Sequence, residues 1–327
     1  MRGLRSVGLL ALYVGAQIVA LALAFPFRAE GLATTSSSAQ ANNPSSPLYL
    51  IALIVIAPLA ILWIARRGGG VKALRLLILG GIAFSLDITL QATFALALPA
   101  PTYLPPFGPA LVFDLSGPFA AVSAVSILLA LLIEPQWYVV DAAGFLAAGA
   151  LIAILGISFG ILPVFVLLVA LAVYDFIAVY RTKHMLSLAD VVVDMKLPIL
   201  MVMPTSSGYD YPSAAPLNAR GAAPGAGVER EALFMGLGDV VIPGTLVVSA
   251  FAWLPTGALA LGVGGNLWVA LGTLLGSLVG YLGLMTLVQK GNAHAGLPFL
   301  NGGAIGGYVL AYLLLFHSAS LGFVLSL

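Results

Sequence analysis

Two aspartates, Asp175 and Asp239, lie inside apolar stretches of the sequence where a charged side chain is costly. Asp175 follows Tyr174 in a run of aliphatic residues, and Asp239 lies within "GLGDVVIPG". Of the twelve acidic residues, only these two and Asp87 are predicted to fall well within membrane spans. A charge at mid-membrane costs about 2.5–3.5 kcal/mol on insertion scales, so all three are candidates for a functional site.

The spacing of the two aspartates from the ends of their helices places them at a similar depth. Asp175 precedes Arg181 by six residues, which is ~9 Å along a helix, and Asp239 follows Glu231 by eight, which is ~12 Å. The helices that carry them are consecutive and antiparallel. If these helices are neighbours, the two carboxylates can face each other.

Two carboxylates that share a site cannot both ionise cheaply, so the pair holds one proton. An aspartic protease uses this arrangement: one carboxylate activates water while the other protonates the carbonyl oxygen. Gly236 and Gly238 remove side-chain bulk beside Asp239, so a backbone or a substrate can come close. Pro243 and Gly244 follow within a turn and are expected to loosen the helix.

Other functions fit parts of this pattern. Intramembrane acids carry protons or cations in transporters, although no pair of broken helices in matched halves is visible here. Prepilin-processing proteases are also aspartic membrane peptidases with Gly-x-Gly-Asp, but nine spans and the Tyr174–Asp175 pair argue against them. Taken singly, Asp87 is expected to be structural or cavity-lining, Tyr174 an ordinary packing aromatic, and Asp239 a hydrogen-bonding group between helices.

Several chemistries lack the residues they need. There are no cysteines, so thiolate metal sites and cysteine nucleophiles are absent. The three histidines are scattered, without the HExxH spacing that holds zinc on one helical face. Carboxylates and water suffice for hydrolysis, so neither a metal nor an organic cofactor is predicted.

The composition is that of an integral membrane protein, with 61% hydrophobic and only 8% charged residues among 327. A bilayer core needs roughly 20 mostly apolar residues per helix. Nine stretches qualify: Val7–Phe27, Leu48–Ala65, Leu74–Leu98, Gly117–Ile133, Tyr138–Ile157, Leu162–Tyr180, Ala232–Trp253, Leu267–Gln289 and Pro298–Phe323.

The basic residues predict the orientation of these spans. With the N-terminus inside, twelve of the thirteen lysines and arginines fall in inner segments and only Arg28 falls outside. The C-terminus is then outside. The first stretch, which could be a signal peptide, exceeds the usual 7–15-residue apolar core and is expected to be a retained helix.

A long inner loop follows the sixth span, over about 181–230. Its second half is rich in Pro, Gly, Ala and Ser and is expected to be mobile. Its first half contains "KLPILMVMP", an apolar run too short to span the membrane. We expect Ile199 and Leu200 within it to bind an unwound substrate by strand pairing; a segment resting on the bilayer surface is the alternative.

With "YD" on one helix and "GLGD" on the next, the sequence resembles the presenilin and signal peptide peptidase family of intramembrane aspartic proteases. A third motif of that family, Pro-Ala-Leu before the ninth helix, corresponds to Pro298, Phe299 and Leu300. Phe299 departs from the alanine. The resemblance is clear from about residue 160 onward and suggests a prokaryotic, archaeal homologue in the cell membrane.

The resemblance implies an all-α membrane protein with nine helices: a scaffold over 1–160 and a catalytic half over 161–327. It implies that Asp175 and Asp239 are the catalytic pair, with Tyr174, Leu237 and the glycines 236 and 238 supporting the site and 298–300 shaping the substrate cleft. The expected partners are transmembrane-helix or signal-peptide substrates in the lipid bilayer. Neither a nucleic acid nor an accessory subunit is indicated.

Overall fold

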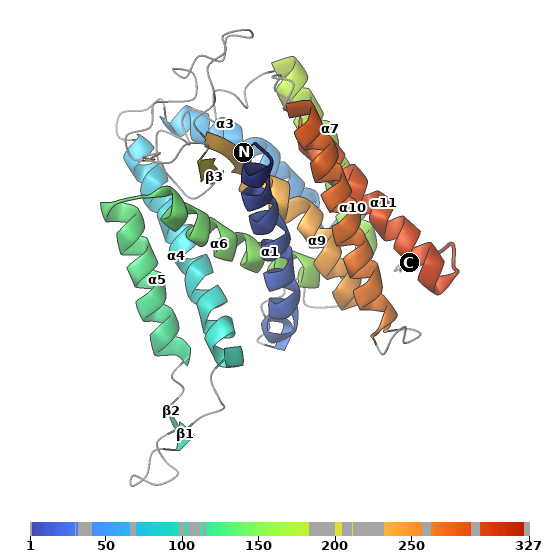
Figure 1. Ribbon diagram of the computed structural model, residues 1–327, viewed down its shortest axis with the longest axis horizontal. Helices are drawn as coiled ribbons and strands as arrows, with labels where there is room; N and C mark the ends of the chain where they lie inside the picture. The colour runs from blue at the N-terminus through green and yellow to red at the C-terminus, as the bar shows by residue number, and fades with distance from the viewer. Residues whose placement is uncertain are drawn as a thin grey trace.

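A computed structural model describes residues 2–29, 31, 41–65, 70–97, 102–103, 112–113, 116–182, 200–204, 211, 232–256, 263–288 and 295–323. The described part of the chain is mainly α-helical, with two small sheets (Figure 1). Its helices of at least 17 residues are α1 (Arg2–Ala29), α3 (Leu48–Ala65), α4 (Gly70–Ala97), α5 (Ser116–Ile133), α6 (Trp137–Ser158), α7 (Ile161–Ile177), α9 (Leu237–Trp253), α10 (Gly265–Val288) and α11 (Leu297–Phe316). A π-helical turn, η1 (Ala178–Thr182), continues α7.

These helices coincide closely with the nine apolar stretches of the sequence, and seven of them are long and apolar enough to cross a membrane. The shorter apolar helices are Leu48–Ala57, within α3, and α9 itself. The seventh stretch was predicted to be helical from Ala232, and this was wrong, because residues 232–236 form a strand. The last helix ends at Phe316 rather than Phe323, since His317 takes a left-handed conformation with φ of 49°.

The strands form two antiparallel pairs at opposite ends of the molecule (Figure 1). One pair, β1 (Thr102–Tyr103) and β2 (Val112–Phe113), lies between α4 and α5. The other joins β3 (Leu200–Pro204) to β4 (Ala232–Gly236), and it lies beside the start of α1. The short apolar run between prolines is therefore extended over residues 200–204, and β4 leads directly into α9.

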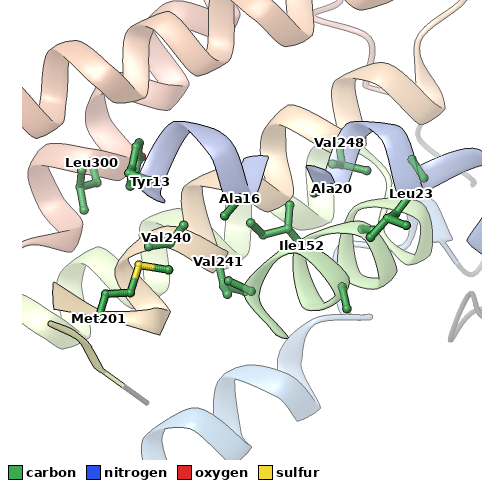
Figure 2. Close-up of a cluster of buried hydrophobic side chains, with 14 of the residues drawn as sticks. Tyr13, Ala16, Ala20, Leu23, Ile152, Met201, Val240, Val241, Val248 and Leu300 are labelled. Atoms are coloured by element: carbon green, nitrogen blue, oxygen red, sulfur yellow. The ribbon is translucent and has the colours of Figure 1, made fainter. Parts of the chain in front are cut away.

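Helix α6 lies in the middle of the described structure, packed against α1, α4, α9 and β3 (Figure 1). Two thirds of its apolar window, 67%, is buried, compared with 22% for α5. Its buried face is made largely of alanine and glycine, which let neighbouring helices approach closely. Figure 2 shows the resulting cluster of side chains from α1, α6, β3, α9 and α11.

A seam of glycines joins α10 to α11. Gly276 and Gly280 of α10 face Gly303 and Gly307 of α11, and a Cβ added at any of the four would meet backbone atoms of the opposite helix. Residues four apart lie on one helical face, so each helix presents a flat strip to the other. The position of α11 is consequently set by backbone-to-backbone packing, which leaves no room for a side chain.

Candidate active site

Asp175 lies near the end of α7, two residues before the helix passes into the π-helical turn. Its side chain is 4% exposed. The backbone N–H of Leu297, at the start of α11, donates a hydrogen bond to Oδ2 of Asp175 over 3.0 Å. The N–H of Gly296 faces the same carboxylate. The beginning of α11 therefore binds Asp175 through main-chain donors, which are the free N–H groups of a helix N-terminus.

Asp239 is the third residue of α9, and its side chain turns back over the residue that precedes the helix. Its carboxylate faces the backbone N–H of Gly236, the N-cap of α9. An acidic third residue has the same place in a capping box, where it lies against the N–H of the N-cap. Because Gly236 has no side chain, Oδ2 of Asp239 can lie only 3.6 Å from where a Cβ would be.

The two carboxylates come together at the backbone of Gly296 and Leu297. A Cβ on Gly296 would lie 3.5 Å from Cγ, Oδ1 and Oδ2 of Asp239. The N–H of Leu297, the next residue, donates its hydrogen bond to Asp175. The charge of Asp175 accordingly acts on Asp239. Both acids thus contact the same two-residue segment, as the depth argument from the sequence required.

Three helices hold this arrangement. α7, α9 and α11 pack against one another around a shared apolar cluster that includes Leu168, Leu246 and Leu297. Asn301 of α11 is buried, and its Nδ2 donates to the carbonyl oxygen of Leu168 on α7 over 2.8 Å. The start of α11 is therefore fixed to α7 by a polar contact one turn beyond the bond to Asp175.

The strand before α9 presents its outer edge to the site. Val202 of β3 pairs with Phe234 of β4, but the N–H of Val202 points away from β4, to Asp141. This pair is therefore not hydrogen-bonded, and the backbone groups of Phe234 also point away from β3. Two residues later the N–H of Gly236 lies on the same outer edge, where it faces Asp239.

The residues predicted to support the two acids differ in burial and in their distance from the site. Tyr174 is half-buried beside Asp175. Leu237 and Gly238 begin α9, and a Cβ on Gly238 would meet nothing within 4 Å.

In the Pro-Phe-Leu motif, Pro298 is half-buried, Phe299 is 37% exposed and Leu300 is fully buried in the core. Leu200 begins β3 opposite Gly236, and Ile199 lies outside the described residues. Asp87 is on α4, which packs chiefly against α5 and α6.

Sequence reasoning missed the residues that contact the two acids most closely, Gly296 and Leu297, which precede the Pro-Phe-Leu motif. It also missed Asp141, which lies near the start of α6 and is only 5% exposed. A signal for Asp141 was available, because Gly144 and Ala148 share its helical face and mark that face as closely packed.

Comparisons with known proteins agree with this geometry. The family model described as signal-peptide peptidase, presenilin aspartyl protease matches residues 10–317. Two solved structures, each described as a presenilin family intramembrane aspartate protease, are similar to this chain. One, in space group C222, has a TM-score of 0.64 and 31% identity, covering 94% of this chain and 99% of its own. The other, in space group P2, has a TM-score of 0.60 and 29% identity, covering 94% and 97%.

A search of the curated proteins finds no match. The family model spans most of the chain, and the similarity to the C222 structure extends over nearly the whole of both proteins. Neither the transporter nor the prepilin-peptidase alternative is favoured by these matches. The chain is a multi-pass integral membrane protein, and it belongs to the signal-peptide peptidase and presenilin family of intramembrane aspartate proteases.

Proposed function

We propose that Asp175 and Asp239 are the catalytic pair with which this protease cuts membrane-spanning helices or signal peptides. The observation that carries the proposal is the convergence of both carboxylates on the Gly296–Leu297 backbone. A pair so close holds one proton between the two acids, which supplies a base and an acid at one place.

The reaction needs only these two groups and water. The ionised carboxylate removes a proton from water, whose oxygen attacks the scissile carbonyl carbon, while the protonated carboxyl donates its proton to the carbonyl oxygen. In the second step the carboxyl that took the proton from water gives it to the leaving nitrogen, while the other carboxylate removes a hydroxyl proton from the tetrahedral intermediate. The C–N bond breaks to give a carboxylic acid and an amine, and the pair again holds one proton. The N–H of Leu297 holds the Asp175 carboxylate in place throughout.

A helical substrate must unwind before water reaches its carbonyl groups, and lost hydrogen bonds are expensive in lipid unless they are replaced. We propose that the run containing Ile199 and Leu200 replaces them by pairing with the unwound substrate as a strand, since residues 200–204 are already extended in β3. β3 in turn pairs with β4, which leads directly into α9 and Asp239.

The remaining assignments follow the sequence. We propose nine spans with the N-terminus inside, cleavage in the inner leaflet, and a prokaryotic cell membrane as the location. A scaffold over 1–160 and a catalytic half over 161–327 describe the chain, although the division is not clean. Helices α1 and α6 of the scaffold pack directly against α9, so the first half also positions Asp239.

Cleavage of a labelled single-span peptide by the purified protein tests the proposal. Asp175→Asn and Asp239→Asn should each abolish cleavage without lowering the melting temperature by more than a few degrees. Asp87→Asn, which changes an acid on α4, is the matched control and should cleave like the wild type. Activity remaining in either Asp175→Asn or Asp239→Asn would remove that residue from the catalytic pair.

A further inference from the structure

Four buried polar side chains meet between α1 and α10, and the mechanism above does not use them. Tyr13 and Gln17 are four residues apart and share one face of α1. Ser277 and Tyr281 are spaced in the same way on α10. The rings of Tyr13 and Tyr281 stack with their centroids 5.4 Å apart, and the Tyr13 hydroxyl faces Gln17 and Ser277. These four residues, each at most 1% exposed, form the α1–α10 polar cluster.

Most hydrogen-bonding atoms of the cluster have no partner in the part of the chain that the structure describes. They are the hydroxyl groups of Tyr13 and Tyr281 and both amide atoms of Gln17. Ser277 donates to the carbonyl oxygen of Leu274 over 2.8 Å, and its own oxygen can still accept. A buried polar atom without a partner destabilises a fold, so such atoms are normally bridged by a bound molecule. Four of them in one place therefore indicate a ligand that both donates and accepts hydrogen bonds.

The cluster adjoins Asp239. The charge of Asp239 acts on the Tyr13 hydroxyl. Tyr13 also packs in the same buried core as Val240, the residue that follows Asp239 (Figure 2). Further along α9, Cγ of Gln17 lies 3.2 Å from where a Cβ of Gly244 would be, so the missing side chain at Gly244 makes room for Gln17. A molecule bound in the cluster is consequently a close neighbour of the acid.

The chemistry of the cluster selects water as its ligand. Phenol hydroxyls and a carboxamide are neutral and can both donate and accept, and a buried ion needs an opposite charge that they do not supply. A buried water makes 2–4 hydrogen bonds to otherwise unpartnered groups, and Tyr13, Gln17 and Ser277 together offer three. Hydrolysis consumes one water for each bond cut, whereas the hydrocarbon core of a membrane holds none to spare.

We propose that the α1–α10 polar cluster is a water-binding site, which holds water beside Asp239 and supplies it to the two acids. The inference rests on the proposed function, because it assumes that Asp239 takes part in hydrolysis. The four side chains bind the water before it reaches the scissile bond, so they are positioning residues. Their loss should lower kcat and leave KM unchanged, because they do not contact the peptide substrate.

Hydroxyl-radical labelling of the intact wild-type protein tests for the water directly, because a radical formed from a bound water modifies the side chains beside it. Tyr13 and Tyr281 should be labelled although they are buried. Tyr308 is the control: it is 0% exposed, and its hydroxyl donates to the carbonyl oxygen of Leu321 over 2.8 Å. Labelling of Tyr13 and Tyr281 should be several-fold faster than that of Tyr308, and equal rates would overturn the inference. This measurement needs no cleavage, so a wild type that never cuts a peptide counts against the proposed function alone.

Kinetics of hydroxyl-deletion variants test the role of the water. Tyr13→Phe and Tyr281→Phe keep the ring, and each should lower kcat about tenfold at unchanged KM, the factor that corresponds to ~1.4 kcal/mol for one lost hydrogen bond. Tyr308→Phe removes a buried hydroxyl from another part of the core, and it should lower the melting temperature but not kcat. An unchanged kcat in both Tyr13→Phe and Tyr281→Phe would overturn the inference. A higher melting temperature in Tyr13→Phe would do the same, because it would show that this hydroxyl had no partner.

Discussion

Replacing Gly276 with alanine should disable the protease from a position far along the chain from Asp175 and Asp239, the two acids proposed to be catalytic. A Cβ at Gly276 would lie 2.6 Å from Cα and 2.8 Å from N of Gly307, and it would also meet the carbonyl oxygen of Gly303. Ordinary contacts between carbon atoms are about 3.5–4.0 Å, so α10 and α11 must separate by about 1 Å. The obstructing atoms are backbone, which cannot rotate aside.

The displacement reaches the site through α11. The N–H of Leu297 lies 3.0 Å from Oδ2 of Asp175, and a shift of about 1 Å exceeds the range of a hydrogen bond. A misplacement of this size can lower the rate about a hundredfold. Overpacking of the seam should also cost about 1–3 kcal/mol of stability.

Gly283→Ala is the matched control, because Gly283 lies on the same helix and a Cβ there would meet nothing within 4 Å. It should be neutral or stabilising by about 0.5–1 kcal/mol, the difference in helix propensity. The assay compares initial cleavage rates of a labelled single-span peptide and thermal unfolding by circular dichroism. If Gly276→Ala equals Gly283→Ala in both rate and melting temperature, the seam does not position α11 and the reasoning fails.

Three further predictions concern the site itself. Cleavage should follow a bell-shaped pH profile, because the pair works only while it holds one proton, and a single titration limb would contradict a shared proton. Gly296→Ala should cleave within about twofold of the wild type, because a Cβ 3.5 Å from the Asp239 carboxylate is an ordinary contact. The larger, branched side chain of Gly296→Val should lower the rate about tenfold or more. Equal rates for the two variants would show that Asp239 lies farther from Gly296. Asn301→Leu removes the bond to the Leu168 carbonyl and should lower stability by about 1–2 kcal/mol, and an unchanged melting temperature would show that this bond does not tie α11 to α7.

Most of the helical architecture could be predicted from the sequence, because a membrane requires long apolar stretches and those stretches are visible directly. The exception is informative. Residues 232–236 are apolar and adjoin the apolar helix α9, so hydropathy alone merges them into one span. Their strand conformation depends on pairing with residues 200–204, a contact between segments about 30 residues apart, which local composition does not encode.

The two acids proposed to be catalytic stand out in the sequence for a related reason, because a carboxylate in an apolar stretch is conspicuous. The groups that hold them are backbone N–H donors of Gly236, Gly296 and Leu297, and every residue except proline has such a donor. Their roles therefore became visible only when the helix ends were located. Asp141 was overlooked because it lies near a helix end, where acidic residues are usually solvated.

Strand β4 and helix α9 share one uninterrupted chain, and Asp239 comes only three residues after the last residue of the strand. If a substrate segment pairs with this sheet, its distance from Asp239 is fixed by the junction between strand and helix. The position of the cut would then depend on the number of residues between the paired segment and the scissile bond, more than on the side chains beside that bond. Substrates would differ chiefly in how easily their helices unwind.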